Sequence, residues 1–441
     1  MTGTMASHYM EELARAEAGL VGADSGWFKA ARRRALTNFG RIGFPTPKDE
    51  EWKYTNVAPI ESRSFRLAER LRNGLDVAEL DRLRQVEAHE LIFVNGHYSA
   101  QLSRLASLPA GVSVAPLSEA LPQDSLQEHI ERQAAEPGNG FAALNAALLS
   151  DGVHIRVGAG ITLKTTLHLL FINTAPDGPT ASFPRVFIEA GANSRVLIIE
   201  HYAGITSDEY FTDALTEINA GPGATVEHYK WQMEGARGYH IGQMFIHQQR
   251  ESRVTSYSLS FGAALARHDI AVRLAGEGAG VSLNGLYMAE GRQHVDHHTS
   301  IDHQQPRTSS AEYYKGVLAG YARGVFDGKV VVREGAQKTD ANLTNKNLLL
   351  SEHAEMDTKP ELQIYADDVK CSHGATVGQL DEDALFYLRA RGIEYPQATA
   401  LLTYAFADDL VARIAIEPMR EAIERQLTAW LPRAALVKGL L

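Results

Sequence analysis

The chain has 441 residues with one cysteine, 44% hydrophobic and 22% charged residues, and a formal net charge of −11. This length exceeds what one compact core supports, so we expect several domains or a repeat architecture. The acidic balance argues against a nucleic-acid or anionic-membrane partner. A single cysteine cannot form an internal disulfide, the first residues hold no apolar secretion segment, and no apolar run approaches about 18 residues, so we expect a cytoplasmic protein without a membrane span.

Residues 1–149 form a predicted N-terminal, mainly helical region. Ser7 is a suitable N-cap for a first helix, and residues 25–43 carry apolar side chains at helical spacing. Two prolines end that helix within residues 43–57 (GFPTPKDEEWKYTNV), where an acidic and aromatic run follows; we expect its aromatic side chains to pack between this region and the core. Residues 91–99 (LIFVNGHYS) are typical of a strand that ends at an Asn-Gly turn.

Residues 150–378 have a different pattern, in which short alternating apolar and polar runs are separated by Gly, Asn and Asp. An Ala-Gly pair stands five residues before a valine at Ala190–Gly191, Ala220–Gly221 and Ala275–Gly276, at offsets of 30 and 55 residues. These offsets are one and two repeats of roughly 27 residues, a period typical of solenoids. Short strands stacked as coils, with glycines at the corners, predict a mainly β fold with a parallel β-helix core. A β-sandwich is the alternative, because short, evenly spaced strands suit it as well.

Helical signals return in residues 379–441. Asp381 is a suitable N-cap for one helix, and Pro396 and Pro418 stand at helix-opening positions. The middle helix carries an apolar stripe that must pack on its own region, on the β-helix or on another protein. The stripe consists of Leu401, Leu402, Phe406, Leu410 and Ile414.

The sequence lacks the motifs of several common enzyme classes. Gly328–Lys329 and Lys338–Thr339 resemble a phosphate-binding loop, but neither has the required glycine and hydroxyl positions. Neither the nucleophile elbow of hydrolases nor the zinc motif of metalloproteases occurs. We therefore predict a protein that is not an enzyme and does not hydrolyse nucleotides.

Histidines are concentrated in residues 293–303 (QHVDHHTSIDH). On a strand, His294, Asp296 and His298 share one face, and His297 points to the other. Imidazole and carboxylate on one face suit zinc or iron, but metal sites usually draw ligands from separate segments. A polar outer face of a coil, with His297 near the apolar side, is the favoured interpretation.

The single cysteine lies in residues 367–378 (DDVKCSHGATVG), where Cys371 and His373 would share one face of a strand. If that face points inward, Cys371 is a small buried hydrophobe. If it points outward, the thiol and the imidazole can both bind a soft metal or form a thiolate–imidazolium pair. A thiol protease is a poorer fit, since its histidine comes from a distant segment.

Three stretches together carry a family resemblance. They are residues 45–57 (PTPKDEEWKYTNV), the long segment from QHVDHH at residue 293 to DVKCSHGATVG at 368–378, and residues 380–393 (LDEDALFYLRARGI). This combination resembles the SufB/SufD family of iron–sulfur cluster assembly proteins, and the DVKCSHGATVG form resembles its SufD branch.

The resemblance implies a right-handed parallel β-helix between N-terminal and C-terminal helical regions. It also implies a non-ATPase scaffold subunit that pairs with a SufB-like subunit through the β-helices and docks a SufC-like ABC ATPase through the C-terminal helices. The apolar stripe from Leu401 to Ile414 is the expected partner-binding surface. Pairing through like surfaces also makes a homodimer of the isolated chain reasonable.

In this family the histidine of the Cys-Ser-His motif, here His373, is implicated in a transient cluster-assembly site shared with the partner subunit. A protein-bound iron–sulfur cluster needs about four ligands, mostly thiolates, and this chain has one cysteine. His373 is therefore the candidate metal ligand and Cys371 a secondary one, with no cluster held stably by the chain alone. Two alternatives stay open: a polysaccharide-acting β-helix enzyme, and a purely structural partner of an ABC-type ATPase.

Overall fold

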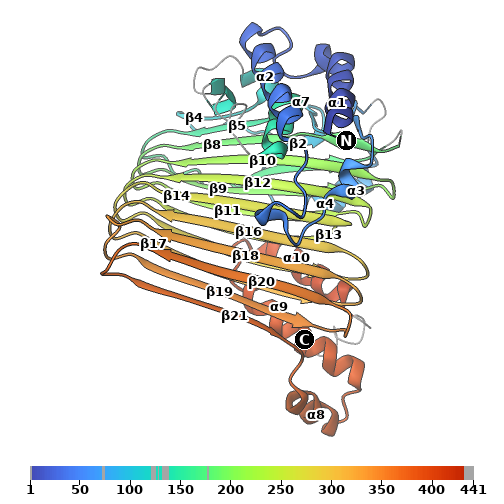
Figure 1. Cartoon of the computed structure of the whole chain (residues 1–441), viewed down its shortest axis with the longest axis vertical. Coiled ribbons are helices and arrows are strands. Elements are labelled where there is room, and N and C mark those ends of the chain that lie inside the picture. The colour runs from blue at the N-terminus through green and yellow to red at the C-terminus, as the bar shows by residue number, and fades with distance from the viewer. Residues whose placement is uncertain are drawn as a thin grey trace.

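The computed structural model describes residues 2–71, 75–120, 126–127, 129–131, 139–175 and 178–431. Its centre is a stack of coils that place their strands alternately in two sheets (Figure 1). Sheet A contains β4 (Val112–Pro116), β5 (Gly152–Val157), β8 (Arg185–Ala190), β10 (Tyr210–Ala220), β12 (Gly238–Gln248), β14 (Leu265–Leu274), β16 (His294–His303), β18 (Arg323–Val332) and β20 (Glu355–Ile364), with β1 (Arg66–Leu67) and β7 (Thr180–Ser182) beside them. Sheet B contains β3 (His97–Tyr98), β2 (His89–Val94), β6 (Leu167–Asn173), β9 (Arg195–Gly204), β11 (Thr225–Glu234), β13 (Arg253–Gly262), β15 (Gly280–Ala289), β17 (Ser309–Leu318), β19 (Asp340–Leu349) and β21 (Lys370–Gly378).

The coil register explains the spacing of the Ala-Gly pairs. Val196 pairs with Val226, Val226 with Val254, and Val254 with Val281, all in parallel. The offset of 55 residues is therefore two coils, with Val254 in the coil between. The parallel β-helix is confirmed and the sandwich is wrong, because each coil pairs with the next instead of crossing to a facing sheet.

Glycine at the coil corners has a steric cause. A Cβ on Gly276 would lie 1.9 Å from the backbone nitrogen of Arg250, in the coil below. Real Cβ atoms do not approach backbone so closely, so only glycine lets adjacent corners stack at this distance.

The N-terminal region combines helices with strands that extend the core. Its helices are α1 (Thr2–Ala16), α2 (Gly26–Ile42), α3 (Ala58–Glu61), α4 (Val77–Leu83), α5 (Leu117–Ala120) and α7 (Gly140–Leu148), with two 3-10 turns, η1 (Glu17–Gly19) and η2 (Glu50–Trp52). β2 pairs in parallel with β6, and Asn95 and Gly96 turn the chain into β3 with φ of 52° and 77°. The strand and Asn-Gly turn are confirmed, and strands first appear well before residue 150.

Two helical layers cover the outer faces of the sheets. Phe141 and Leu144 of α7 pack with Phe211 and Ile241 on the outer face of sheet A. On the other side, α9 (Tyr395–Val411) and α10 (Glu417–Trp430) lie against sheet B, as Figure 1 shows. Asp381 caps α8 (Glu382–Ala390) by accepting from the amides of Asp383 and Ala384, as predicted. Among the described residues, none of the helices combines the length and the apolar character that crossing a bilayer requires.

The segment at residues 43–57, called the strap below, crosses the outer face of sheet A (Figure 1). Trp52 packs against Phe141 with the rings tilted and 5.4 Å between their centroids, as expected for an aromatic side chain between the N-terminal region and the core. The Arg267 guanidinium of β14 lies 3.6 Å from the Trp52 ring centroid, and it also donates to the Glu51 carbonyl at 2.7 Å. Tyr54, by contrast, is 37% exposed and does not pack as expected. The strap thus joins two parts of the chain more than 200 residues apart.

Candidate functional site

Cys371 and His373 lie on β21, the last strand of sheet B. Cys371 pairs with Ala341 of β19, and His373 pairs with Leu343. Ala341 and Leu343 are both buried in the core, so the two motif residues stand on the core-facing side of the ladder. On the opposite side, Ser372 accepts a hydrogen bond from Asn342 at 2.7 Å. The face shared by Cys371 and His373 is therefore the inner face of the last coil.

The two side chains differ in burial. Cys371 is partly buried and packs with Val369 and Leu362 against an apolar cluster that includes Val330 and Ala341. Burial and the nearby Asp340 carboxylate raise the pKa of the Cys371 thiol. His373 is exposed, because it occupies a core-facing position where the described chain places no further coil above it. The thiol therefore packs in part, while the imidazole is free to reach a ligand.

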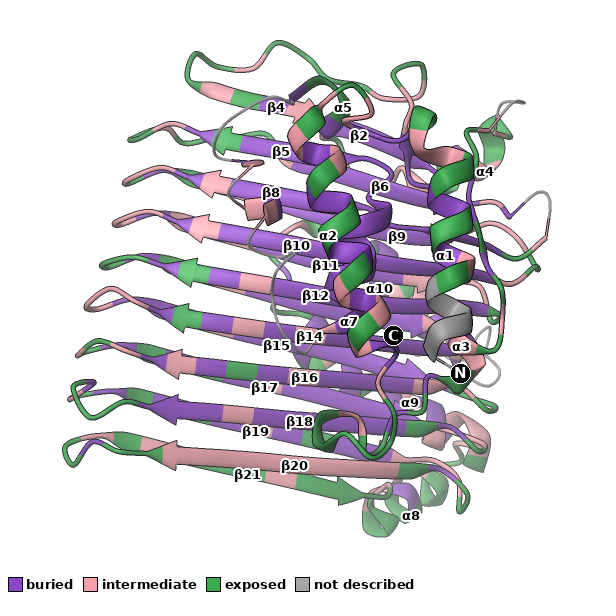
Figure 2. Ribbon diagram, turned by 45° about the horizontal axis from the view of Figure 1, so that its top comes forward, coloured by how far each residue is buried: buried purple, intermediate pink, exposed green. Residues whose placement is uncertain are grey.

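The end of the solenoid around this motif is open. β20 and β21 are the terminal strands of their sheets, so one side of each carries backbone groups without a ladder partner. Figure 2 shows β20 half-buried and β21 mostly exposed, in contrast to the buried coils behind them. Ile364, Tyr365 and Val377 are 42%, 60% and 44% exposed at this end. These apolar side chains and His373 are thus all exposed on the last two strands or the turn between them.

The motif offers two potential metal ligands, one thiol and one imidazole. Alternate residues on a strand lie about 6.6 Å apart, so the thiol and the imidazole can reach neighbouring positions of a cluster more easily than one ion. An iron–sulfur cluster needs about four ligands, and the chain has one cysteine. The motif alone therefore supplies fewer ligands than such a cluster needs.

The histidine-rich strand β16 has the alternation predicted from its sequence. His297 points into the solenoid, where its ring stacks on Tyr287 at 5.2 Å between ring centroids and meets the Ser260 hydroxyl at 3.2 Å. His294, Asp296 and His298 lie on the outer side of sheet A. They do not form the expected solvated face, because the strap covers them and leaves Asp296 only 1% exposed.

Asp296 is the centre of a buried polar network under the strap. Its carboxylate accepts from Arg267 at 2.9 Å and lies 3.1 Å from Nε2 of His298, and the Thr55 hydroxyl bridges it to His294. Burial alone would raise the pKa of Asp296, but the charges of His298 and Arg267 hold it far below its usual value. Burial alone would lower the pKa of His298, but Asp296 and Glu51 raise it to about 10. The network therefore carries charge on both partners at neutral pH.

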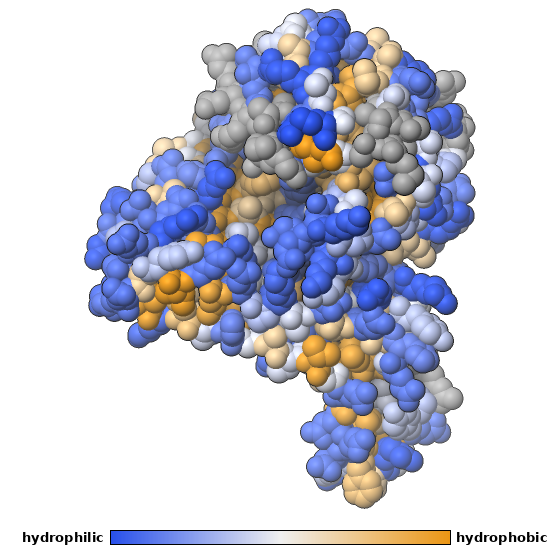
Figure 3. Space-filling view, in the orientation of Figure 1, coloured by the Kyte–Doolittle hydropathy of each residue, from blue (hydrophilic) through white to orange (hydrophobic). Residues whose placement is uncertain are grey.

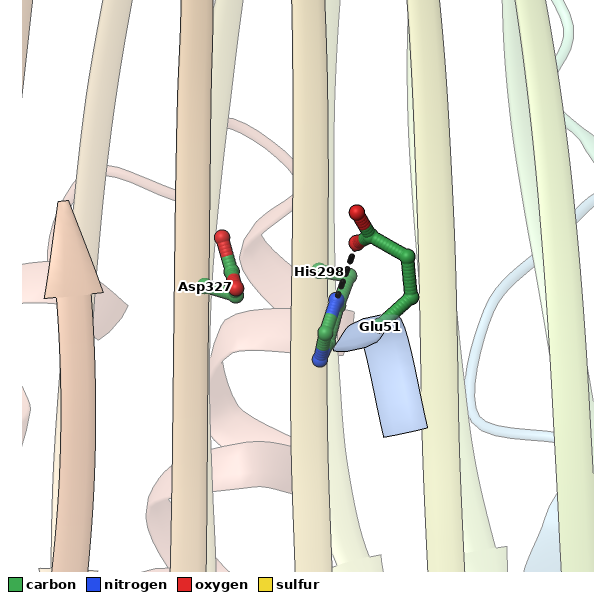
Figure 4. A group of neighbouring side chains, drawn as sticks. All are labelled: Glu51, His298 and Asp327. Carbon is green, nitrogen blue, oxygen red and sulfur yellow. Dashed lines mark ion pairs between the residues drawn. The ribbon is translucent and has the colours of Figure 1, made fainter. Parts of the chain in front are cut away.

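Two acidic residues that the sequence did not single out complete this cluster. Glu51 of the strap lies 3.7 Å from Nδ1 of His298, and Asp327 of β18 pairs with His298 in the ladder of sheet A. Figure 4 shows the three side chains converging from the strap, β16 and β18. Contacts between segments this far apart leave no periodic signal; the only sequence clue was the acidic run before Trp52.

The predicted partner-binding stripe on α9 is largely occupied within the chain. Leu410 and Ile414 are fully buried against the outer face of sheet B, where Leu259, Leu286 and Val317 meet them. Phe406 is partly buried and packs under the Lys315 ammonium, 4.6 Å from its ring centroid. Leu401 and Leu402 are half-buried. The stripe therefore packs on the β-helix, which leaves little of Leu410 and Ile414 for a partner.

The most exposed aromatic residues of the C-terminal region lie on α8 and at the start of α9 instead. Phe386 is 74% exposed, and Tyr387 and Tyr395 are each 55% exposed. Helix α8 projects beyond the last coil, and Figure 3 shows apolar residues on the projection. Aromatic side chains on a projecting helix are typical anchors for a protein partner.

Known proteins match the chain along nearly its whole length. The family model for the SufBD core domain of SUF-system iron–sulfur cluster assembly matches residues 171–406, and the model for the SufBD N-terminal region matches residues 4–169. A SufBD family protein of Synechocystis is 33% identical over 401 residues, covering 88% of each chain. The iron–sulfur cluster assembly protein SufD of Escherichia coli is 32% identical over 90% of this chain and 91% of its own. SufD of Bacillus subtilis is 26% identical over 92% of this chain and 94% of its own.

Proposed function

The chain belongs to the SufBD family of iron–sulfur cluster assembly proteins, and we propose that it is a non-ATPase scaffold subunit. In this proposal it pairs with a SufB-like subunit at the open end of its β-helix and docks a SufC-like ABC ATPase through its C-terminal helices. The nascent cluster is cargo, held between the subunits and then released. The observation that carries the proposal is the exposed position of His373 at a sheet edge that another chain can extend.

Pairing at the open end is supported by the unpaired outer edges of its two terminal strands. Terminal strands β20 and β21 can each accept one further strand, which would satisfy their free backbone groups. The exposed Ile364, Tyr365 and Val377 would then lose contact with water. A partner that closes this end also brings its ligands within reach of His373. A second copy of this chain presents the same edges, so a homodimer of the isolated chain is expected as well.

His373 is the proposed ligand, and Cys371 a second one. The imidazole is exposed on the inner face, whereas the thiol is partly packed and its raised pKa disfavours the thiolate that binds iron. A shell completed only in the complex suits a scaffold, because separating the subunits removes ligands and releases the cargo.

ATPase docking is proposed for the projecting α8 and the start of α9, where Phe386, Tyr387 and Tyr395 are exposed. Leu401, Leu402 and Phe406 remain accessible in part and can extend this surface. Removing residues 395–431 is a poor test of docking, since it would uncover the apolar outer face of sheet B. The end of the chain, residues 432–441, lies outside the described residues.

Co-purification and reconstitution test the proposal together. The chain is co-expressed with a SufB-like subunit and a SufC-like ATPase, purified through a tag on this chain, and treated anaerobically with ferrous iron and sulfide. We expect both partners to co-purify, a cluster absorbance band in the complex, and none in the chain alone. Phe386→Ala should release the ATPase and keep the SufB-like subunit. A stable stoichiometric cluster on the isolated chain would contradict the shared site. An intact complex without a cluster would instead support the alternative that the chain is a purely structural partner of the ATPase.

A further inference from the structure

A cluster of potential metal ligands lies on the outer face of sheet A, far in sequence from the Cys-Ser-His motif. We propose that Glu51, His298 and Asp327 form a binding site for a divalent first-row transition-metal ion beneath the strap. One ligand atom from each of these residues lies within 4.8 Å of the other two. This proposal does not depend on the cluster-assembly site at the open end, because it uses different residues on a different surface.

The three ligands come from three separate segments that the fold holds together. His298 and Asp327 are direct partners in the parallel ladder of β16 and β18, so the sheet fixes their spacing. Glu51 approaches from the strap, whose position is set by the stacking of Trp52 on Arg267. Ligands drawn from separate segments are typical of true metal sites, in contrast to a run of acidic residues on one loop.

His298 is oriented as a metal-binding histidine usually is. Its Nε2 lies 3.1 Å from a carboxylate oxygen of Asp296, while its Nδ1 faces Glu51 at 3.7 Å. A carboxylate that accepts from one imidazole nitrogen fixes the ring and makes the other nitrogen a stronger metal ligand, an arrangement found around zinc. Asp296 is itself immobilised by Arg267 and Thr55 and is 1% exposed. Asp296 would act as a positioning residue for this ligand.

The ligand atoms need a small closing motion. Donor atoms around a tetrahedral ion are about 3.4 Å apart, given bond lengths of roughly 2.1 Å. Glu51 and His298, at 3.7 Å, are already near this spacing, and no pair of the three ligand atoms is more than 4.8 Å apart, so closing requires at most about 1.4 Å. The Glu51 side chain is 67% exposed and has room to adjust. His298 and Asp327 are 13% and 11% exposed in their side chains and need not move far.

The site opens into a cavity that leaves room for further ligands. The cavity has a volume of about 570 Å³ and is lined by the strap, the start of α7 and the sheet A strands β12, β14, β16 and β18. Three protein ligands leave coordination positions for water or for a small molecule in this space. One imidazole with two carboxylates favours zinc, manganese or ferrous iron over calcium or magnesium, which prefer oxygen ligands alone.

Lys359 and the proton on Nδ1 of His298 both compete with this ion, because a charged imidazole must lose that proton before it can bind a metal. The Lys359 ammonium lies 3.3 Å from Asp327 and 3.3 Å from Glu50, so a metal ion must displace one ion pair to use the Asp327 carboxylate. This contact also gives the sharpest test. If the cluster binds a metal ion, removing the lysine charge strengthens binding; if the cluster is only a set of ion pairs, removing it produces no site.

The experiment titrates the isolated full-length chain with Co²⁺ and with Zn²⁺, following cobalt by its visible absorption and zinc by calorimetry. The Cys371→Ser background excludes binding through the thiol. We expect about one equivalent of Co²⁺, an affinity at least tenfold weaker in His298→Gln and Asp327→Asn, and a tighter affinity in Lys359→Met. Glu355→Gln is the matched control, since Glu355 is an exposed carboxylate of sheet A that pairs with Arg323 and lies outside the three-ligand group, and the cobalt affinity of this variant should not fall.

Stoichiometric binding that survives in His298→Gln, or no stoichiometric binding in the parent chain, would overturn the proposal. If His298→Gln or Asp327→Asn fails to fold, as judged by circular dichroism, Glu51→Gln decides the question, because that side chain is mostly exposed and its loss should leave the fold intact. Unchanged cobalt affinity in a folded Glu51→Gln variant would remove Glu51 from the site and overturn the three-ligand proposal.

Discussion

His373 of β21 is the direct ladder partner of Leu343 of β19, in the coil before it. Leu343 is fully buried, whereas His373 is exposed. The imidazole therefore occupies a position that every earlier coil fills with a side chain enclosed by the next coil. Among the described residues, nothing encloses His373.

The first prediction concerns this imidazole. His373→Ala should reduce cluster formation by the complex at least tenfold, because the shared shell loses a ligand that neighbouring side chains cannot replace. Subunit composition should not change, since the substitution removes no buried apolar surface. The measurement is anaerobic reconstitution followed by absorbance and iron content, with size-exclusion chromatography of the complex.

His353→Ala is the matched control, because His353 is also an exposed histidine near this end and lies in a turn, stacked on Tyr321. It should assemble clusters as the parent complex does. Parental rates in His373→Ala would remove this histidine from the site, and a fall in both variants would point to a general effect on the end of the solenoid.

The second prediction separates packing from docking in the C-terminal region. Leu410 is fully buried against sheet B, so Leu410→Ala should lower the free energy of unfolding by about 3 kcal/mol. Phe386 is 74% exposed, so Phe386→Ala should change the free energy of unfolding by less than about 0.5 kcal/mol. The same substitution should weaken ATPase binding. Urea unfolding of the isolated chain measures both changes in stability. Equal stability of the two variants would contradict the packing of α9 on the β-helix.

The repeat architecture was predictable because each coil repeats one local rule. Alternation recurs from coil to coil and glycine stands at many of the corners, and the Ala-Gly spacing alone matched the ladder that joins Val196, Val226 and Val281. Helix caps such as Asp381 were equally local. These features depend on neighbours within a few residues or on a fixed period.

What the sequence did not predict depends on long-range packing. The stripe that ends in Leu410 and Ile414 indicated burial but not which surface would cover it. The strap sets Glu51 beside His298, about 250 residues away, and no periodicity connects them. Whether His373 was exposed depended on β21 being the last strand of its sheet, which a motif alone does not reveal.

The third prediction concerns pH. Burial inside the solenoid raises the pKa of Glu312 from 4.5 to about 7. The folded chain therefore holds this proton up to a higher pH than the unfolded chain does. The contribution of Glu312 to the free energy of unfolding should fall as the pH rises from about 4.5 to about 7 and stay constant above that, with a total loss of about 3 kcal/mol from this group.

Glu312→Gln removes this dependence, since glutamine cannot ionise. The difference in the free energy of unfolding between the variant and the parent chain should shift in favour of the variant by up to about 3 kcal/mol between pH 5 and pH 8. Glu334→Gln, at an exposed turn position, is the control and should show no such gain. Urea unfolding across this pH range measures all three chains, and parallel stability curves for parent and Glu312→Gln would contradict a carboxyl that is neutral when folded.

The fourth prediction tests the steric origin of the corner glycines. A Cβ on Gly276 would lie 1.9 Å from the backbone nitrogen of Arg250 and 2.3 Å from the carbonyl carbon of Gln249, whereas one on Gly335 would meet nothing within 4 Å. Because backbone cannot yield as a flexible side chain can, Gly276→Ala should force adjacent coils apart and cost about 3 kcal/mol. Gly335→Ala, also at a corner, should change stability by less than about 0.5 kcal/mol. Thermal and urea unfolding compare the two directly: a neutral Gly276→Ala would mean that coil spacing adapts to a methyl group, and glycine at that corner would then need a different explanation from close stacking.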